Sequence, residues 1–284
     1  MHVFLNGRFV PEEQAVVSVF DRGFLYGDGL FETLLVRDGR PLFWAEHLAR
    51  LQRGAALLKL SVPFEPAPLR QFAGELIGRN RMSAAVLRLT LSRGVGLRGY
   101  STRGAESPTL VMTLHPAPPA AVSPLQWRLL TASWRVPAND PLAQVKTCNK
   151  LVQILARAEA EAASVDEAVV LNTNGDVAET AGGSLFWIQG ETVCTTPVAS
   201  GVLAGVTRGV LLEICRDRGV ATREVDIQPD ALACAQGVFV TTSTLGVIEA
   251  VSLDGQPLSR ALLTTELRGA YEQLISSPAA DCGR

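Results

Sequence analysis

The stretch that decides the fold begins Val145-Lys146-Thr147-Cys148-Asn149-Lys150 and ends Glu179-Thr180-Ala181-Gly182-Gly183-Ser184. Between these runs, the spacing of apolar residues predicts a helix through Glu161, and Ala168 to Leu171 is typical of a buried strand that turns at Asn174-Gly175. A lysine ahead of a helix and a carboxylate after the next hairpin can face the same cavity. We expect the rest of the chain to shape a pocket around these two groups.

Composition narrows the class of protein. The chain has 284 residues, of which 47% are hydrophobic and 19% charged, so it can form one large or two modest domains. A net charge of -2 argues against nucleic acid or an anionic membrane as the main partner. No apolar run reaches the roughly 18 residues of a membrane span. The partner expected from composition is therefore a small molecule.

The cysteines and histidines point the same way. Five scattered cysteines without CxxC spacing argue against a disulfide framework or a zinc site, and they favour a reducing cytoplasm. None of the three histidines is paired at metal-binding spacing. We therefore expect no metal and a cytoplasmic location.

Residues 1–116 predict a small N-terminal α/β lobe. Alternation around Asn6-Gly7 predicts a hairpin, because this dipeptide accepts the positive φ angles of a tight turn. An apolar stripe of Leu48, Leu51, Ala55 and Leu58 predicts a helix, with Arg50 off the centre of the stripe. The expected strands are Val3 to Val10 as two, Leu30 to Arg37, Ala84 to Leu91 and Thr109 to Leu114, and the expected helices are Trp44 to Leu60 and Pro68 to Arg79.

Four prolines between His115 and Pro124 predict a linker at 117–124, which leaves 125–284 as a larger C-terminal lobe that carries Lys146. The fold class expected is therefore two-lobed α/β. In the helix after Lys146, we expect Leu151, Ile154, Leu155 and Ala158 to face inward. Further strands are expected at Gln126 to Ser133, Leu185 to Gln189, Thr192 to Thr195, Val238 to Thr241 and Gly246 to Val251, and further helices at Arg208 to Arg218 and Ser259 to Leu274, before a loose polar tail.

Several features suit an anionic ligand. Ser92 to Thr102 packs glycines between arginines, Gly205 to Thr207 lies at a helix N-terminus, and Thr242 to Thr244 groups hydroxyls after a buried strand. Each also has an ordinary explanation, such as an exposed loop or a threonine N-cap. With Arg50, Lys146 and Glu179 they describe one ligand that has a phosphate, a group reactive toward amines and a ring nitrogen.

The order of these motifs resembles the class IV (fold type IV) pyridoxal-phosphate family, which includes branched-chain aminotransferases, D-amino acid aminotransferases and 4-amino-4-deoxychorismate lyases. The resemblance runs from Val3 to about Leu274 and implies a D-amino acid aminotransferase-like fold, pyridoxal 5'-phosphate as cofactor, and a homodimer. It is carried by Asp21-Arg22-Gly23, Tyr26 to Glu32, Glu46 to Leu51, Lys146 with Asn149, Glu179 before Gly182, Gly205-Val206-Thr207 and the Thr242 cluster.

The resemblance also implies residue roles. Lys146 would form the covalent bond to the cofactor and shuttle protons, because a desolvated lysine is nucleophilic near neutral pH. Glu179 would pair with the ring nitrogen and keep it protonated. Lys150 is the rival lysine, but the pattern places it inside the helix. The implied phosphate ligands are Arg50, Gly205, Val206, Thr207, Thr242 and Ser243.

Within the family, the loop Ser92 to Thr102 and the run Lys146 to Leu151 look most like those of the lyases. The expected reaction converts 4-amino-4-deoxychorismate to 4-aminobenzoate and pyruvate, on the route to folate, and its small anionic amine substrate calls for cationic residues. Thr33 is expected to influence the choice of reaction. Aminotransfer on branched-chain or D-amino acids is the alternative, and a catalytically silent scaffold is the third. The expected substrate contacts are Tyr26, Arg93, Arg98, Tyr100 and Thr244.

Overall fold

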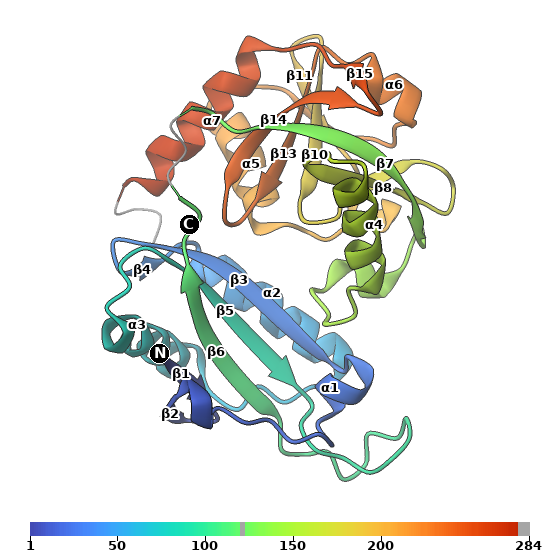
Figure 1. Cartoon of the computed structure of the whole chain (residues 1–284). Helices are drawn as coiled ribbons and strands as arrows, with labels where there is room; N and C mark the ends of the chain where they lie inside the picture. Colours follow the sequence, from blue (N-terminus) through green and yellow to red (C-terminus); the bar gives the residue numbers. More distant parts are fainter. Residues whose placement is uncertain (120–122, 278–284) are drawn as a thin grey trace. The chain divides into compact units, whose positions relative to one another are not determined.

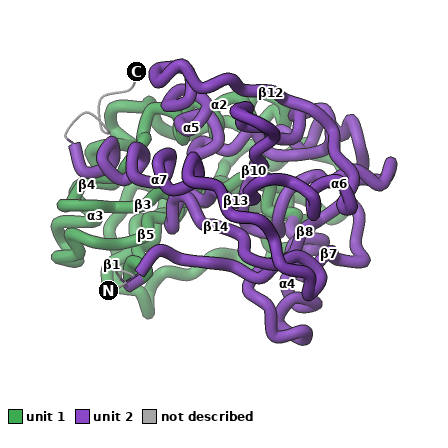
Figure 2. The backbone as a smooth tube through the Cα atoms, turned by 90° about the horizontal axis from the view of Figure 1, so that it is seen from above, with its two compact units in different colours: residues 1–118, 145–149, 278–284 green, residues 119–144, 150–277 purple. Residues whose placement is uncertain are grey.

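The computed structural model describes residues 1–119 and 123–277, and the chain divides into two compact units (Figure 2). Unit 1 contains Met1–Pro118 and Val145–Asn149, and unit 2 contains Pro119–Gln144 and Lys150–Ser277. The segment with Lys146 therefore groups with unit 1, whereas the sequence pattern places it in the C-terminal lobe. Residues 120–122 of the expected linker, and the expected loose tail from residue 278, lie outside the described residues.

Unit 1 is built on an antiparallel six-stranded sheet in the order β2-β1-β6-β5-β3-β4 (Figure 1). The hairpin predicted at Asn6-Gly7 is confirmed, with φ angles of 48° and 89°. The strands are β1 (His2–Leu5), β2 (Arg8–Pro11), β3 (Gly29–Arg37), β4 (Arg40–Pro41), β5 (Ala85–Ser92) and β6 (Thr109–Pro116). The helices are α1 (Arg22–Tyr26), α2 (Trp44–Leu58) and α3 (Pro66–Asn80).

Helices α2 and α3 pack on one face of this sheet. Leu30, Leu34 and Val36 of β3 are buried in the same apolar core as the α2 stripe, as the two-residue period of a strand requires. Phe31 and Thr33 lie on the opposite face, where Thr33 is paired with Arg88 of β5. One face of the sheet thus forms the core, and the other carries the mixed polar residues.

Unit 2 is built on a nine-stranded mixed sheet in the order β12-β11-β10-β13-β14-β7-β8-β9, with β15 beside β14. The strand β7 is parallel to both of its neighbours, β14 and β8. The strands are β7 (Gln126–Val136), β8 (Glu167–Asn172), β9 (Val177–Thr180), β10 (Ser184–Gln189), β11 (Thr192–Thr195), β12 (Thr222–Glu224), β13 (Gly237–Thr242), β14 (Gly246–Leu253) and β15 (Gln256–Pro257). The helices are α4 (Leu151–Ala162), α5 (Val206–Asp217), α6 (Pro229–Ala233) and α7 (Leu262–Ile275).

The inward face predicted for α4 is wrong. Leu151 and Ile154 are 67% and 62% exposed, whereas Ala156 and Ala160 are fully buried. These alanines lie four residues apart on one helical face and pack in the core formed with β7 and β8, where small side chains let the helix approach the sheet closely. Among the described residues, no helix has the length and apolarity needed to cross a membrane.

Candidate active site

Lys146 lies on a short extended segment that pairs with the edge of β3. Its carbonyl accepts a hydrogen bond from the Phe31 amide at 2.9 Å, and the Cys148 amide donates to the Gly29 carbonyl at 2.9 Å. An antiparallel bridge joins Leu30 and Thr147. The backbone on either side of Lys146 is therefore fixed to β3, and this pairing explains why the segment belongs to unit 1.

The side chain of Lys146 shares an aromatic ring with an arginine. Its Nζ lies 4.6 Å from the centroid of the Phe31 ring, and Cζ of Arg88 lies 3.9 Å from the same centroid. Burial lowers the pKa of Arg88 below its ordinary value, but the group remains a cation at neutral pH. An amine and a cation are therefore presented close together on the face of the sheet that also carries Thr33.

Arg88 was missed as a site residue from the sequence. The pattern there gave it weight only as half of an arginine-histidine pair whose other position is Thr90. The available signal was its position in β5, where it alternates with buried leucines and so points away from the core.

The sequence contains only three lysines, at 59, 146 and 150. Lys59 caps the C-terminus of α2 with a φ of 52°. Lys150 is the N-cap of α4 in unit 2, whereas the sequence pattern places it within the helix. Of the three, Lys146 is the one that lies in unit 1 beside Phe31 and Arg88.

A buried ionic cluster holds Arg50. Its Nε and Nη2 donate to Oε1 and Oε2 of Glu32 at 2.9 and 2.6 Å, and Nδ1 of His47 donates to Oε2 of Glu32 at 2.7 Å. Burial works to raise the pKa of Glu32, but the hydrogen bonds from Arg50 and His47 outweigh it and hold that pKa at about 2. Burial lowers the pKa of His47. The carboxylate is therefore ionised and fixes the plane of the Arg50 guanidinium.

Glu32 and His47 were not foreseen as members of the site. Glu32 occupies an inward position of β3 between the buried residues Phe31 and Leu34. A carboxylate at such a position needs charged or hydrogen-bonding partners, and that need was the signal available in the sequence.

The remaining candidate cofactor ligands lie in unit 2. Helix α5 begins at Val206 with Gly205 as its N-cap, and no side chain caps it, so its first amides suit an anion together with the helix dipole. Thr207 is the second residue of the helix, 3% exposed, and is not the N-cap. A Cβ at Gly205 would lie 2.7 Å from Oγ of Ser184, so the tight approach of the chain here requires glycine.

Two further features of unit 2 carry polar groups. The strand β13 ends at Thr242, whose hydroxyl accepts a hydrogen bond from the Leu245 amide at 3.0 Å across the turn that contains Ser243 and Thr244. Glu179 lies on β9, half-buried, and accepts a hydrogen bond from the Leu203 amide at 3.1 Å. This donor set fits the cofactor implied by the sequence: amides and hydroxyls for a phosphate and a carboxylate for a ring nitrogen in unit 2, with Arg50 and Lys146 in unit 1.

The expectation that Arg93 binds substrate requires correction. Its Nε and Nη2 donate to the carboxylate of Asp28 at 2.8 and 3.0 Å, and its Nη1 and Nη2 donate to the carbonyls of Lys59 and Leu58 at 3.0 and 2.8 Å. All three guanidinium nitrogens therefore bind the protein itself. Arg93 neutralises Asp28 and satisfies the last carbonyls of α2.

The other expected substrate contacts fall in two places. Arg98 and Tyr100 lie on the exposed loop of unit 1, and Tyr100 is 89% exposed. Tyr26 is half-buried at the end of α1, and its hydroxyl accepts a hydrogen bond from the Gly99 amide at 3.1 Å. Thr244 lies in unit 2. The structure thus brings Tyr26, Arg98 and Tyr100 together around one loop.

Comparisons with known proteins agree with this site. The amino-transferase class IV family matches residues 29–253. A relative from Methanocaldococcus jannaschii, which carries the provisional name branched-chain-amino-acid aminotransferase, is 32% identical over 91% of this chain and 90% of its own. The 4-amino-4-deoxychorismate lyase from Pseudomonas aeruginosa is 32% identical, with a TM-score of 0.84 over 99% of this chain and 100% of that one.

A branched-chain amino acid aminotransferase from T.th. that was solved with pyridoxamine 5'-phosphate is 27% identical, with a TM-score of 0.90 over 100% of this chain and 95% of that one. The family match covers well over half of the chain. The protein therefore belongs to the class IV aminotransferase family of pyridoxal-phosphate-dependent enzymes, with the fold type IV architecture.

Proposed function

We propose that this protein is a lyase that converts 4-amino-4-deoxychorismate to 4-aminobenzoate and pyruvate. The substrate has the same atoms as the two products together, so the reaction needs no second substrate. The observation that carries the proposal is the placement of Lys146 and Arg88 over the ring of Phe31. This arrangement suits a substrate that has both an amine and a carboxylate.

Each residue of that face has a proposed task. Bound pyridoxal 5'-phosphate supplies an electron sink for the carbon that bears the substrate amine. Lys146 holds the cofactor and then removes the proton from that carbon, and Arg88 binds a substrate carboxylate. Thr33 is paired with Arg88 in the sheet, and its hydroxyl is proposed to hydrogen-bond to the oxygen of the departing enolpyruvyl group.

The phosphate and the ring are proposed to be held by residues of both units. Arg50 binds the phosphate together with the amides of Val206 and Thr207, next to Gly205, and with the turn that carries Thr242 and Ser243. Glu179 binds the ring nitrogen. Arg98, Tyr26, Tyr100 and Thr244 remain the proposed contacts for the rest of the substrate.

The choice of lyase over aminotransferase rests on the run Lys146 to Leu151 and on the end-to-end similarity to the Pseudomonas lyase. Aminotransfer on branched-chain or D-amino acids is the second candidate, and the Methanocaldococcus relative favours it. Both reactions begin with proton removal by Lys146. They differ in whether the enolpyruvyl group leaves or an acceptor keto acid is required.

We also propose a homodimer in the cytoplasm, on the route to folate. Val16, Val19, Phe20 and Phe24 of unit 1 are 76%, 64%, 64% and 74% exposed, and such a group of apolar side chains suits contact with a second copy. The four described cysteines are free thiols, which suits a reducing compartment.

The experiment supplies 4-amino-4-deoxychorismate alone to the purified protein loaded with pyridoxal 5'-phosphate and measures 4-aminobenzoate and pyruvate. Equal amounts of both products, absent with Lys146→Ala, are expected. A parallel reaction contains branched-chain or D-amino acids with 2-oxoglutarate. Turnover in the second reaction only would replace the lyase by the aminotransferase.

A further inference from the structure

We propose that Asp28, acting through Arg22 and Arg93, positions the loop at residues 98–101 relative to Lys146 and thereby sets the affinity for the anionic substrate. The placement of the loop follows from the contacts of unit 1 alone, and its effect on substrate rests on the proposed function. Asp28 and Arg22 are positioning residues, because they act through the loop and do not themselves contact substrate in this proposal.

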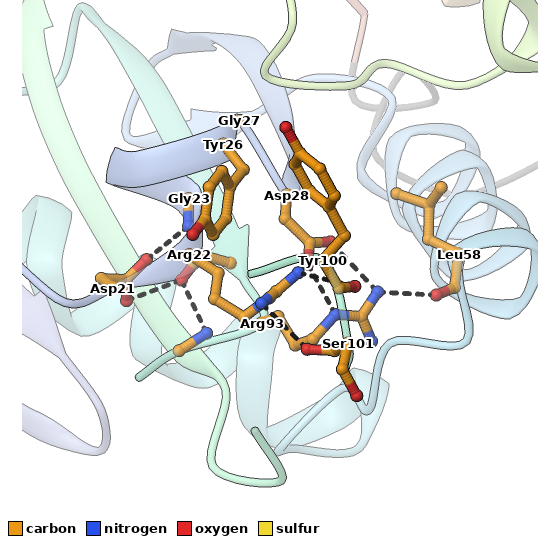
Figure 3. Close-up of polar contacts among 12 residues, drawn as sticks. Asp21, Arg22, Gly23, Tyr26, Gly27, Asp28, Leu58, Arg93, Tyr100 and Ser101 are labelled. Atoms are coloured by element: carbon orange, nitrogen blue, oxygen red, sulfur yellow. Dashed lines mark hydrogen bonds and ion pairs between the residues drawn. The ribbon is translucent and has the colours of Figure 1, made fainter. Parts of the chain in front are cut away.

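The carboxylate of Asp28 lies between two arginines (Figure 3). Its Oδ2 accepts hydrogen bonds from Nε of Arg22 at 2.9 Å and Nε of Arg93 at 2.8 Å, and its Oδ1 accepts one from Nη2 of Arg93 at 3.0 Å. The side chains of Arg22, Arg93 and Asp28 are 4%, 10% and 15% exposed. Removing the carboxylate would leave two nearly buried cations facing each other without compensation, which is costly.

Arg22 connects this carboxylate to the loop. Its Nη1 donates to the carbonyls of Gly99 and Ser101 at 2.9 and 3.0 Å, and its Nη2 donates to the carbonyl of Tyr100 at 3.4 Å. Three successive carbonyls thus converge on one guanidinium, whose Nε is fixed by Asp28 (Figure 3). A planar group with several donors can bind such a turn, whereas the single ammonium of a lysine cannot reproduce the geometry.

Apolar packing contributes little to the position of the loop. Leu97 and Tyr100 are 73% and 89% exposed. A cleft of about 240 Å³ lies behind the loop, lined by the end of α2 around Lys59 together with Arg93, Thr102 and Glu106. With an open cleft on one side and solvent on the other, the polar contacts of Arg22 are what hold residues 99–101 in place.

The glycines of this loop serve the same arrangement. A Cβ at Gly96 would lie 3.0 Å from Cδ of Arg22 and 2.9 Å from Cβ of Ala105. At Gly94, with a φ of +82°, a Cβ would lie 1.8 Å from the carbonyl oxygen of Ser107. Glycine at these positions lets the loop close over the Arg22 side chain, so the alternation of glycine and arginine here reflects backbone packing.

The same turn also holds the lysine segment. Nδ2 of Asn149 donates to the Gly27 carbonyl at 3.2 Å, and the Cys148 amide donates to the Gly29 carbonyl at 2.9 Å. Asp28 lies between these two carbonyls in the chain. Its backbone therefore belongs to the turn that fixes the Lys146 segment, while its side chain fixes the loop, so Asp28 sets the position of one relative to the other.

Arg98 is the loop arginine left for substrate. Arg22 and Arg93 are occupied by Asp28 and by backbone carbonyls, whereas the side chain of Arg98 is exposed. The next residue, Gly99, is held on both sides: its amide donates to the Tyr26 hydroxyl and its carbonyl accepts from Arg22. The Asp28 cluster thus controls where Arg98 and Tyr100 are presented.

The test compares Asp28→Asn with wild type in the full-length holoenzyme, using trypsin and steady-state kinetics. Arg98 and Arg103 are exposed loop sites, so cleavage after them reports how often the loop opens. We expect Asp28→Asn to speed this cleavage about tenfold and to raise KM for 4-amino-4-deoxychorismate about tenfold, with kcat changed less than about threefold. The cofactor absorbance should not change. Asp166→Asn, which removes an exposed ion pair with Arg128 in unit 2, is the matched control and should resemble wild type in each measurement.

Cleavage of the loop at the wild-type rate in folded Asp28→Asn would overturn the positioning role. Faster cleavage with an unchanged KM would overturn the link to substrate. If wild type does not convert this substrate at all, the proposed function fails, while the cleavage rates still decide the positioning role. Should Asp28→Asn not fold, Arg22→Lys decides the question, with faster loop cleavage expected and wild-type cleavage contradicting the proposal.

Discussion

The guanidinium of Arg50 donates two parallel hydrogen bonds to the carboxylate of Glu32, at 2.9 and 2.6 Å, with both side chains within the interior of unit 1. Bidentate pairs of this kind fix the orientation of the arginine as well as neutralising both charges. The third member, His47, donates to the same carboxylate at 2.7 Å. Glu32 therefore holds in place the arginine that is proposed to bind the cofactor phosphate.

Replacing Glu32 by glutamine should destabilise the protein strongly. The substitution removes the charge that compensates buried Arg50, and breaking a buried pair costs about 3 kcal/mol or more. Urea unfolding monitored by circular dichroism measures the change. Glu75→Gln is the matched control, because Glu75 pairs with Arg79 at the surface, where such a pair contributes about 0.5 kcal/mol or less. Equal losses for the two variants would contradict the structural importance of the Glu32 cluster.

The same cluster predicts that stability falls in acid. The pKa of Glu32 is about 2 in the folded protein against an ordinary value of 4.5, so its contribution is complete above pH 4.5 and is lost as the pH falls toward 2. The pKa of His47 is lowered from 6.5, so the unfolded chain takes up a proton first and stability declines below that pH as well. Unfolding free energies measured from pH 7 to pH 3 should decrease, and Glu32→Gln should flatten the lower part of the curve. An unchanged slope in the variant would contradict the assignment.

Arg88 should matter for substrate affinity more than for cofactor binding. A charge-assisted hydrogen bond contributes about 1.5–3 kcal/mol, so Arg88→Gln should raise KM for a carboxylate substrate roughly tenfold or more. The cofactor absorbance should remain. Arg128→Gln, at an exposed ion pair of unit 2, is the control. A KM equal to that of the control would exclude Arg88 from the substrate contacts.

Local patterns predicted the regular elements of the fold well, because the causes are local. The hairpin at Asn6-Gly7 follows from positive φ angles that this dipeptide accepts, and α2 follows from the apolar stripe through Leu48 and Leu51. The inward face of α4 was mispredicted, because the larger apolar residues suggested a core face while Ala156 and Ala160 make the close contact with the sheet.

The site was predictable only as a set of residue types. Lys146 and Arg50 were found from their motifs, but the partners of Arg50 depend on how α2 packs on β3, which no local pattern contains. Arg93 illustrates the limit: an arginine between glycines suits a ligand and a cluster of backbone carbonyls equally well, and only the fold distinguishes them.

The loop glycines give a prediction that separates steric clash from backbone strain. Gly94 and Gly99 both have positive φ, at +82° and +103°, but a Cβ would meet the Ser107 carbonyl at 1.8 Å only at Gly94, and nothing within 4 Å at Gly99. Gly94→Ala should therefore destabilise the protein by about 2 kcal/mol more than Gly99→Ala, measured by urea unfolding. Equal losses would show that strain alone accounts for the effect.

The most direct measurement identifies the lysine that holds the cofactor. Purified protein is incubated with pyridoxal 5'-phosphate, its visible absorbance is recorded before and after borohydride, and the reduced protein is digested and mapped by mass spectrometry. We expect a band that borohydride abolishes, with the label on the peptide that contains Lys146, and we expect Lys146→Ala to lose the band while Lys150→Ala and Lys59→Ala retain it. A label on Lys150 or Lys59, or no reducible band in the wild type, would contradict the assignment of Lys146.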